Sequence, residues 1–284
     1  MDSIATKTTV IYCFTVFERI VNGMANRIYA GVDIGAATAK TVVVSDSEVL
    51  GYAVIPTGHD VKLAAERVTA EALERSKVYR RIEELDYIIS TGYARHAVDY
   101  SRRTVTEIIC HAKGARFLVA EARVVIDIGG QDSKAIELDE DGGVTDFVMN
   151  DKCAAGTGRF LEVMAGVLQV GSIDNMGPMS LKSRVPSSIS STCTIFAESE
   201  VVSLRAAGWS REDLIAGVHC AIASRVAMMA GRLNIRPKVI FTGGVAQNVG
   251  VKQALEEALG LSVVVPDEPQ IIGALGAALI AREG

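Results

Sequence analysis

The chain has 284 residues, of which 49% are hydrophobic and 22% are charged. This composition is typical of a globular, core-forming protein and gives no sign of extensive disorder. The net charge of −5 and the lack of a basic cluster argue against a nucleic-acid partner. Five widely spaced cysteines in a chain of this length argue against a disulfide framework, so we expect a cytoplasmic protein.

The N-terminal 26 residues stand apart from the rest. Residues 8–17 are apolar, but Glu18 and Arg19 end the run, which is too short to span a bilayer. The residues that follow do not supply a good signal-peptidase site. We interpret residues 1–26 as an N-terminal appendage, with an extra strand or a loose arm as open alternatives. We expect that no segment of the chain is long and apolar enough for a membrane helix, and we expect no membrane partner.

The first convincing element is a strand from Arg27 to Ile34, and a β-branched run from Thr41 to Ser45 can pair back on it. Small residues lie at the tip of this hairpin. Further on, the spacing predicts helices over 61–73 and 105–118, with a strand over 87–90 between them. We predict that residues 27–118 form a first lobe.

The opening pattern then returns. Strands are predicted over 123–128 and 134–138, and the motif D-I-G-x4-K occurs at the end of the first strand of both hairpins. Asp33, Gly35 and Lys40 correspond to Asp127, Gly129 and Lys134, each 94 positions later. A repeated motif in a repeated strand context indicates a duplicated lobe. We therefore assign residues 119–284 to a second lobe.

The second lobe continues with alternating helices and strands. Helices are predicted over 159–168, 194–207, 213–233, 249–259 and 271–281, strands over 238–242 and 262–265, and an irregular stretch over 171–191. Strands that alternate with helices indicate an α/β fold.

The repeated hairpins suit phosphate binding. Small residues let backbone N–H groups approach an anion. Carboxylates repel phosphate, so Asp33 and Asp127 are candidates to hold Mg²⁺ through water. Lys40 can place a cation on the terminal phosphates. Two facing hairpins would enclose the phosphates of a nucleotide, and the segment 242–244 (TGG) fits a close approach to adenosine, although a plain turn fits it equally well.

Two cysteines share an unusual setting. Cys153 and Cys193 each lie shortly before a predicted helix, where backbone N–H groups and the helix dipole stabilise a thiolate. They are too far apart for a local metal knuckle. An iron–sulfur cubane needs four thiolates, which a symmetric dimer could supply from two chains. On the residues alone, two inert thiols remain the more frequent alternative. We interpret Cys110 and Cys220 as core residues.

Several long motifs follow one another along the chain: GVDIGAATAK, STGYAR, IDIGGQDSK, MNDKCAAGTGRFLE, SSTCTIFAESEV, FTGGVAQN and GALGAAL. In these motifs the chain from Arg27 onward resembles the ATP-dependent activators of 2-hydroxyacyl-CoA dehydratases, within the wider family of benzoyl-CoA reductase ATPase subunits. The resemblance implies a two-lobed fold of the actin, hexokinase and acetate-kinase type, with duplicated ribonuclease-H-like lobes. It also implies a homodimer that holds one [4Fe–4S] cluster through Cys153 and Cys193 of each chain.

The resemblance further implies an activity. ATP and Mg²⁺ would bind in the cleft, and ATP binding and hydrolysis would drive a low-potential electron from the cluster to a partner iron–sulfur enzyme. Ferredoxin or flavodoxin would be the electron donor. The candidate catalytic residues are Asp33, Asp127 and Gln131. The candidate nucleotide-binding residues are Gly35, Ala36, Ala37, Thr38, Ala39, Lys40, Gly129, Gly130, Asp132, Ala155, Gly156, Arg159, Gly243, Gly244, Gln247 and Asn248.

The first loop departs from the family pattern at two positions. The first loop of the family often carries hydroxyl residues where this chain has Ala36 and Ala37. Backbone N–H contacts survive the change, but side-chain donors are lost, so we expect weaker ATP binding. Three alternatives stay open: an ATPase subunit of a benzoyl-CoA-type reductase or an activase of another double-cluster reductase, a small-molecule kinase of the same fold, and a non-catalytic ATP-binding regulator.

Overall fold

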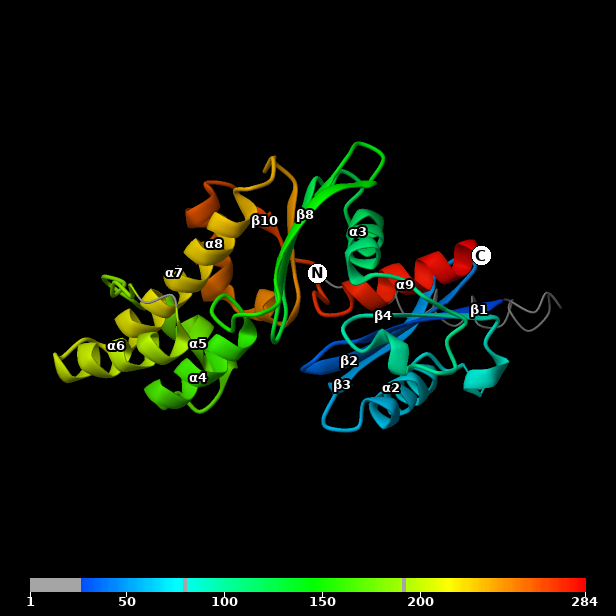
Figure 1. Ribbon diagram of the computed structural model, residues 1–284, viewed down its shortest axis with the longest axis horizontal. Helices are drawn as coiled ribbons and strands as arrows, with labels where there is room; N and C mark the ends of the chain where they lie inside the picture. The colour runs from blue at the N-terminus through cyan, green and yellow to red at the C-terminus, as the bar shows by residue number, and fades with distance from the viewer. Residues whose placement is uncertain (1–26, 79–80, 191–192) are drawn as a thin grey trace, which may run out of the picture.

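The computed structural model describes residues 27–78, 81–190 and 193–284. They form two five-stranded mixed sheets with helices on their faces (Figure 1). The strand order is β3-β2-β1-β4-β5 in the first sheet and β10-β9-β6-β7-β8 in the second. When the second sheet is followed from β8, it repeats the order of the first. The duplicated lobe that the sequence predicts is therefore present as a repeated topology.

The first sheet and its helices come from the N-terminal half of the described chain. The elements are β1 Ile28–Ile34, β2 Thr38–Ser45, β3 Val49–Pro56, α2 Val61–Arg75, η1 Ile82–Glu84, β4 Tyr87–Thr91, η2 Arg95–Ala97, β5 Arg103–Thr104 and α3 Glu107–Leu118. Asp60 caps the N-terminus of helix α2, because its side chain accepts a hydrogen bond from the backbone N–H of Leu63, and the helix packs on one face of this sheet.

The second sheet and the remaining helices follow. The elements are β6 Val124–Ile128, β7 Ser133–Leu138, β8 Val144–Asn150, α4 Gly158–Leu168, α5 Ile173–Ser180, α6 Thr194–Ala206, α7 Arg211–Ala230, β9 Val239–Thr242, η3 Gly244–Gln247, α8 Val249–Leu259, β10 Val263–Val264 and α9 Ile272–Glu283. Helices α4, α7 and α8 share one large core with β6 and β9.

The duplication extends to small irregularities. The pairing of β2 with β3 shifts register at Val43/Val44, and the pairing of β7 with β8 shifts at Glu137/Leu138, which is the equivalent place 94 positions later. The first hairpin places Asp33 opposite Lys40, and the second places Asp127 opposite Lys134. The two lobes therefore present the same residue types at the same points of their sheets.

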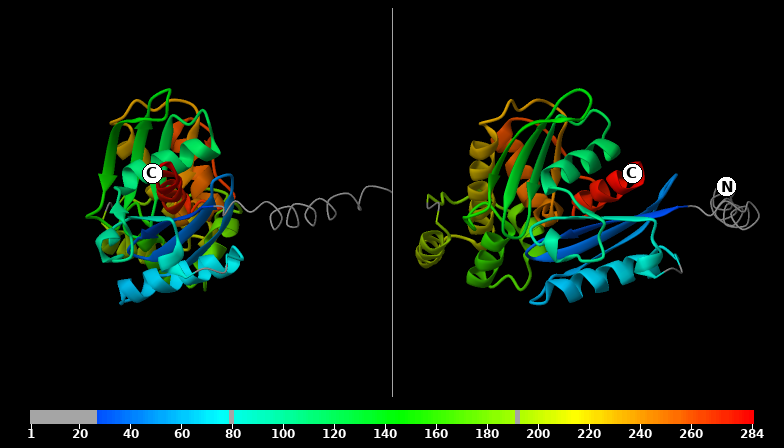
Figure 2. Two further views of the ribbon diagram at one scale, coloured as in Figure 1. Left: turned by 90° about the vertical axis from the view of Figure 1, so that its right-hand side faces the viewer. Right: turned by 45° about the vertical axis from the view of Figure 1, so that its right-hand side comes forward.

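The last helix of the chain returns to the first sheet. Helix α9 packs on the face of β1 and β4 opposite to α2, and α3 lies between α9 and the second sheet (Figure 2). The helices α3 and α9 cross closely at Gly276, where a β-carbon would overlap the carbonyl oxygen of Cys110. The predicted boundary between the lobes, at residues 118 and 119, stays a prediction. Helix α9 belongs by sequence to the predicted second lobe but packs on the first sheet.

Two sequence-based expectations are wrong. The stretch 171–191 contains helix α5, which is capped by Ser172; the Ser172 hydroxyl accepts a hydrogen bond from the backbone N–H of Asp174 at 3.2 Å. Helix α7 is, by length and composition, long and apolar enough to cross a membrane, contrary to the expectation that no segment is. Its side chains Leu214, Ile215 and Val218 are buried in the core, which explains their apolar character.

Candidate functional site

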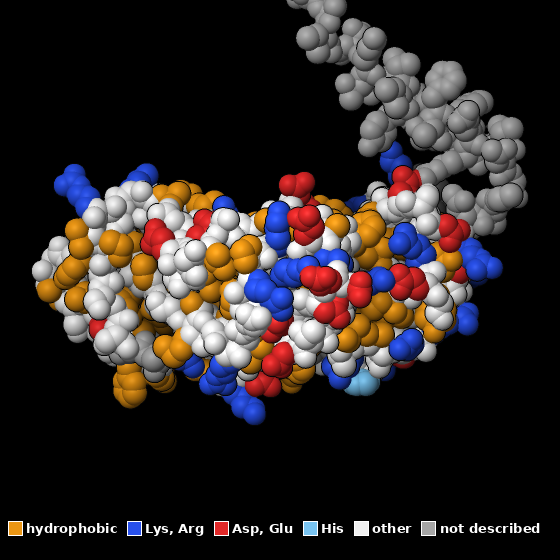
Figure 3. Space-filling view, turned by 90° about the horizontal axis from the view of Figure 1, so that it is seen from above, with side chains coloured by type: hydrophobic (Ala, Val, Ile, Leu, Met, Phe, Trp, Pro, Cys, Tyr) orange, Lys and Arg blue, Asp and Glu red, His pale blue; other side chains and the backbone are white. Residues whose placement is uncertain are grey.

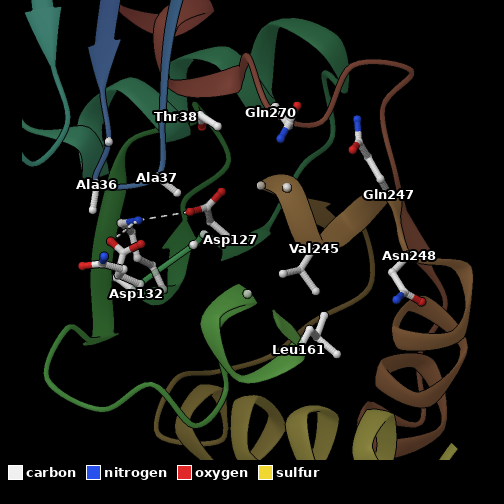
Figure 4. Close-up of a pocket in the computed structure, with 18 of the residues that line it drawn as sticks. Ala36, Ala37, Thr38, Asp127, Asp132, Leu161, Val245, Gln247, Asn248 and Gln270 are labelled. Carbon is white, nitrogen blue, oxygen red and sulfur yellow. Dashed lines mark hydrogen bonds and ion pairs between the residues drawn. The ribbon is translucent and has the colours of Figure 1, made fainter. Parts of the chain in front are cut away.

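A cavity of about 690 Å³ lies between the two sheets. Both repeated hairpins, the start of α4, helix α5 and the loop after β9 contribute to its walls (Figure 4). Most of the residues predicted for nucleotide and Mg²⁺ binding line this cavity. They are Asp33, Gly35, Ala36, Ala37, Thr38, Lys40, Asp127, Gly129, Gly130, Gln131, Asp132, Gly243, Gly244, Gln247 and Asn248.

Each hairpin closes with the same tight turn. The backbone N–H of Gly35 donates to the carbonyl of Thr38 at 3.1 Å, and that of Gly129 donates to the carbonyl of Asp132 at 2.9 Å. The residues between these anchors face the cavity. Because small side chains stand at the turns, their backbone N–H groups are open to a ligand, as phosphate binding requires.

Each hairpin also carries a buried ion pair. Lys40 Nζ lies 3.3 Å from Asp33 Oδ2, and Lys134 Nζ lies 3.0 Å from Asp127 Oδ2. Thr242, at the end of β9, donates to Asp127 Oδ1 at 2.9 Å. The Asp127 carboxylate is thus held in place by the strands on both sides of it, whereas Asp33 is held by Lys40 of β2.

The second pair belongs to a larger network that the sequence interpretation did not anticipate. Lys134 Nζ lies 2.7 Å from Asp132 and 3.9 Å from Glu107, and His111 Nδ1 lies 3.6 Å from Asp127 Oδ1. Glu107 and His111 come from α3, which no motif linked to the cleft. The sequence does link Lys134 to the cavity, because Lys134 occupies the position of Lys40 in the repeated motif.

Charge and burial shift the pKa values in this network. Burial alone would raise the pKa of Asp127, but Coulombic attraction to His111 and Lys134 and the hydrogen bonds from Lys134 and Thr242 hold that pKa well below its usual range. Burial alone would lower the pKa of Lys134, but Asp127, Asp132 and Glu107 raise it above its usual range. Burial raises the pKa of Glu107.

This end of the cavity has the donors that a divalent cation needs. Four carboxylates, those of Asp33, Glu107, Asp127 and Asp132, face two ammonium groups, those of Lys40 and Lys134. The excess of acidic oxygen suits a hard cation such as Mg²⁺. Because no three of the described His, Cys, Asp and Glu side chains converge on a metal-sized site, these residues fit the predicted cation as a Mg²⁺ held through water.

The opposite end of the cavity is more apolar. Leu161 of α4 and Val245 of η3 point into it, next to Gln247 and Asn248 (Figure 4). The Oδ1 atom of Asn248 caps α8 by accepting the N–H groups of Gly250 and Val251 at 3.0 and 3.1 Å. An apolar wall with a few polar groups is the usual lining for a flat heterocyclic ligand.

Four predicted nucleotide-binding residues do not line the cavity. Ala39 is buried in β2, and Ala155 is buried just ahead of α4. Gly156 has φ +89° and packs against Arg225. Arg159 is largely exposed and bonds Glu162 at 2.8 Å. Their predicted contact with nucleotide remains a prediction.

The predicted cluster cysteines lie on the second lobe. Cys153 is half-buried, and Cys193 is exposed directly before α6. Within residues 27–78, 81–190 and 193–284, no three His, Cys, Asp or Glu side chains converge on a metal-sized site. Among the described residues, Cys153 and Cys193 thus do not form a complete ligand set within one chain. Cys110 is buried, as expected, and Cys220 is half-buried against the core.

Comparisons with known proteins agree with this geometry. The activator of lactoyl-CoA dehydratase from Anaerotignum propionicum is 46% identical over 254 residues, covering 89% of this chain and 96% of that protein. Component A of (R)-2-hydroxyglutaryl-CoA dehydratase from Acidaminococcus fermentans has a TM-score of 0.86 at 41% identity, covering 90% of this chain and 98% of that one. The activator of 2-hydroxyisocaproyl-CoA dehydratase from Clostridium difficile, solved with bound ADPNP, has a TM-score of 0.84 at 39% identity, covering 90% and 94%.

A ROK family glucokinase from Streptomyces griseus shares the fold alone, with a TM-score of 0.54 at 14% identity over 90% of this chain and 100% of that one. The expected actin- and hexokinase-like fold is therefore confirmed. A family model matches residues 30–281, and the chain belongs to the BadF/BadG/BcrA/BcrD ATPase family.

Proposed function

We propose that the protein is an ATP-dependent one-electron donor that works as a homodimer with one [4Fe–4S] cluster shared by its two chains. The electron acceptor would be an iron–sulfur enzyme, such as a 2-hydroxyacyl-CoA dehydratase or a related reductase. A ferredoxin or flavodoxin would supply the electron. The similarity to dehydratase activators over about nine-tenths of the chain supports this assignment.

The cavity supports the ATP part of the proposal. Its acidic end, with Asp33 and Asp127, would hold Mg²⁺ beside the phosphates, and the turns at Gly35 and Gly129 would offer backbone N–H groups to them. The apolar end at Leu161 and Val245 would take the adenine. The ADPNP bound to a relative of 39% identity is consistent with this placement.

One observation carries the link between nucleotide and thiol. The segment with Cys153 leads into α4. At the start of this helix the backbone N–H of Gly158 donates to the carbonyl of Gly129, and that of Arg159 donates to the carbonyl of Gly130, both at 2.8 Å. Upstream, the Asn150 side chain donates to the carbonyl of Cys153 at 2.8 Å. A shift of the second phosphate-binding turn therefore pulls directly on the backbone that carries Cys153.

The surface beside Cys193 supports a shared site. Ile195 and Phe196, in the first turn of α6, are 70% and 67% exposed. Hydrophobic side chains are also exposed at the end of the molecule that carries α6 (Figure 3). Apolar surface beside an exposed thiol suits burial against a second copy, which would bring the thiol count to four. The donor set, four thiolates from two chains, is the one that a cubane cluster takes.

These contacts suggest separate roles for the cluster and for the protein chain. The bound cluster would supply a low-potential, one-electron carrier. The chain would bind MgATP between its lobes, and closure of the lobes would be the two-state change that nucleotide biases. The start of α4 would transmit this change to Cys153.

Serine substitution separates this function from a kinase on the same fold. In anaerobically purified Cys153→Ser protein, we expect ADPNP to bind as in the wild type. Electron transfer from dithionite-reduced protein with MgATP to a 2-hydroxyacyl-CoA dehydratase should be lost. Cys220→Ser, which alters a half-buried thiol away from the cavity, is the matched control and should behave as wild type. Electron transfer that survives in Cys153→Ser would contradict the proposal.

A further inference from the structure

The duplication places a second loop at the cavity, in the first lobe. Strand β4 ends at Thr91-Gly92 and leads into η2, just as β9 ends at Thr242-Gly243 and leads into η3. Thr91 pairs with Asp33 as Thr242 pairs with Asp127. The two glycines share nearly the same left-handed backbone, with φ +89° and +88°. The loop after β4 is thus the structural twin of the loop that lines the apolar end.

This twin loop carries charge where the other is neutral. Arg95 opens η2 and lines the cavity, whereas η3 contributes residues without charge. The loop is tied to the first phosphate-binding turn, because the N–H of Ala94 donates to the carbonyl of Ile34 at 2.9 Å. Gly92 lies against the Asp33 carboxylate, where a β-carbon would overlap Oδ1. Arg95 therefore stands at the acidic, phosphate-binding end of the cavity.

Arg95 differs from the other cations of the cavity in its partners. Lys40 and Lys134 are both paired with carboxylates. In the described part of the chain, Arg95 has no carboxylate within 4.0 Å, and its Nη1 donates only to the carbonyl of Gly92, at 3.3 Å. A guanidinium has several N–H donors in a planar fork, so most of its capacity is left for a ligand.

We propose that Arg95 binds the terminal phosphate of ATP and is the residue by which the cavity distinguishes ATP from ADP. The inference rests on the proposed ATP site and names the side chain that would bind the terminal phosphate at its acidic end. The carboxylates there exceed the lysines, so the terminal phosphate needs positive charge beyond that of Mg²⁺ and the lysines. The guanidinium of Arg95 is placed to supply it as a charge-assisted, bidentate contact.

The test compares two nucleotides in the full-length protein with Mg²⁺ present. Isothermal titration would give the Kd values of ADPNP and ADP for wild type, Arg95→Gln and Arg95→Lys. Loss of hydrogen bonds between charged groups should weaken ADPNP binding about 10- to 100-fold in Arg95→Gln and leave ADP within about threefold. Arg95→Lys keeps a point charge but loses the planar fork, so its ADPNP affinity should lie between those of wild type and Arg95→Gln.

The control is Arg103→Gln, because Arg103 is exposed on β5 and does not line the cavity. It should bind both nucleotides as the wild type does. Equal losses for ADP and ADPNP in the Arg95 variants would indicate a damaged loop, and no loss for either would remove Arg95 from the site; both results overturn the inference. A wild-type protein that binds neither nucleotide would instead contradict the ATP site itself.

Discussion

Gly130 and Ala37 meet where the two hairpin turns face each other across the cavity. A β-carbon placed on Gly130 would lie 2.5 Å from the Cβ atom of Ala37, a separation that real β-carbons essentially never show. The Ala37 side chain thus leaves no room for a side chain at position 130. Residues almost a hundred positions apart in the chain set the width of the cavity at this point.

Gly130→Ala should therefore push the turns apart. Overpacking of this kind costs about 1–3 kcal/mol, and here we expect the cost to appear in ADPNP affinity, because the turns belong to the binding surface. Titration of nucleotide would measure it. Gly166→Ala is the matched control, since Gly166 lies in α4 with open space around it, and it should raise the free energy of unfolding by about 1 kcal/mol. Unchanged ADPNP binding in Gly130→Ala would contradict the role of this contact.

Lys134 should matter more for stability than its counterpart Lys40. Lys134 is 2% exposed and faces three carboxylates, so Lys134→Met leaves buried charges unpaired and should cost about 3–5 kcal/mol in urea unfolding. Lys40 is less buried and faces one carboxylate, so Lys40→Met should cost clearly less. Equal losses of unfolding free energy in Lys134→Met and Lys40→Met would show that Asp132 and Glu107 add nothing to the pair of Lys134 with Asp127.

The same network predicts a dependence of stability on pH. The pKa of Asp127 lies below its ordinary value of 3.8 in the folded protein, so its contribution is complete above that value and is lost as the pH falls below it. In Lys134→Met the pKa of Asp127 should rise. The acid-induced loss of unfolding free energy through Asp127 should then be smaller and should end at a higher pH than in wild type, although it begins near the ordinary value of 3.8 in both proteins. Superimposable acid profiles for the two proteins would argue against this coupling.

His219 gives a second, independent pH effect. Burial lowers its pKa to about 4, and its Nε2 lies 3.4 Å from the Asn248 amide nitrogen. The Asn248 oxygen already accepts two backbone N–H groups, so this nitrogen donates and His219 Nε2 accepts. Stability from neutral His219 is complete above about pH 6.5 and falls on acidification by about 1.4 kcal/mol per pH unit down to the folded pKa.

Comparison of wild type with His219→Gln tests this. Between pH 7.5 and pH 5, the wild type should lose about 2 kcal/mol of unfolding free energy through this group. His219→Gln offers an acceptor that does not titrate, so its loss over the same range should be smaller by that amount. A variant with the same acid sensitivity as wild type would show that His219 is not the titrating group.

Ala36 offers a gain-of-affinity prediction. Ala36 is exposed at the tip of the first turn and lines the cavity. Ala36→Ser adds one donor toward the phosphates, worth about 1 kcal/mol, or roughly fivefold in the Kd of ADPNP. Val49→Ser, on the exposed part of β3, is a control without a cavity contact. Weaker binding in Ala36→Ser would contradict the orientation assigned to this turn.

Periodicity in the sequence predicts most elements of this fold because their patterns are local. Helix α8 spans the predicted residues 249–259, capped by Asn248, and the repeated D-I-G-x4-K motif predicts both hairpins. Helix α5 was missed because Gly177 and Pro178 lie within its eight residues and mask the helical pattern. That α9 returns to the first sheet is a long-range packing result, which no local pattern contains.

The cavity was predictable as far as its residues repeat or belong to loops. The turns and the segment after β9 contain small residues whose chemistry points to phosphate. Glu107 and His111 were not predictable, because they reach the cavity only through the crossing of α3 with α9. Arg95 belongs to the motif STGYAR, but its place at the cavity is evident only when the loop after β4 is compared with the loop after β9.

The measurement that tests the central claim most directly is iron and acid-labile sulfide per dimer in protein purified without oxygen, with the visible spectrum before and after dithionite. The account predicts about four irons and four sulfides per dimer, a spectrum that bleaches on reduction, and loss of the iron in Cys193→Ser. A colourless, iron-free wild-type protein that still binds ADPNP would contradict the account and would favour a kinase or a nucleotide-binding regulator on the same fold.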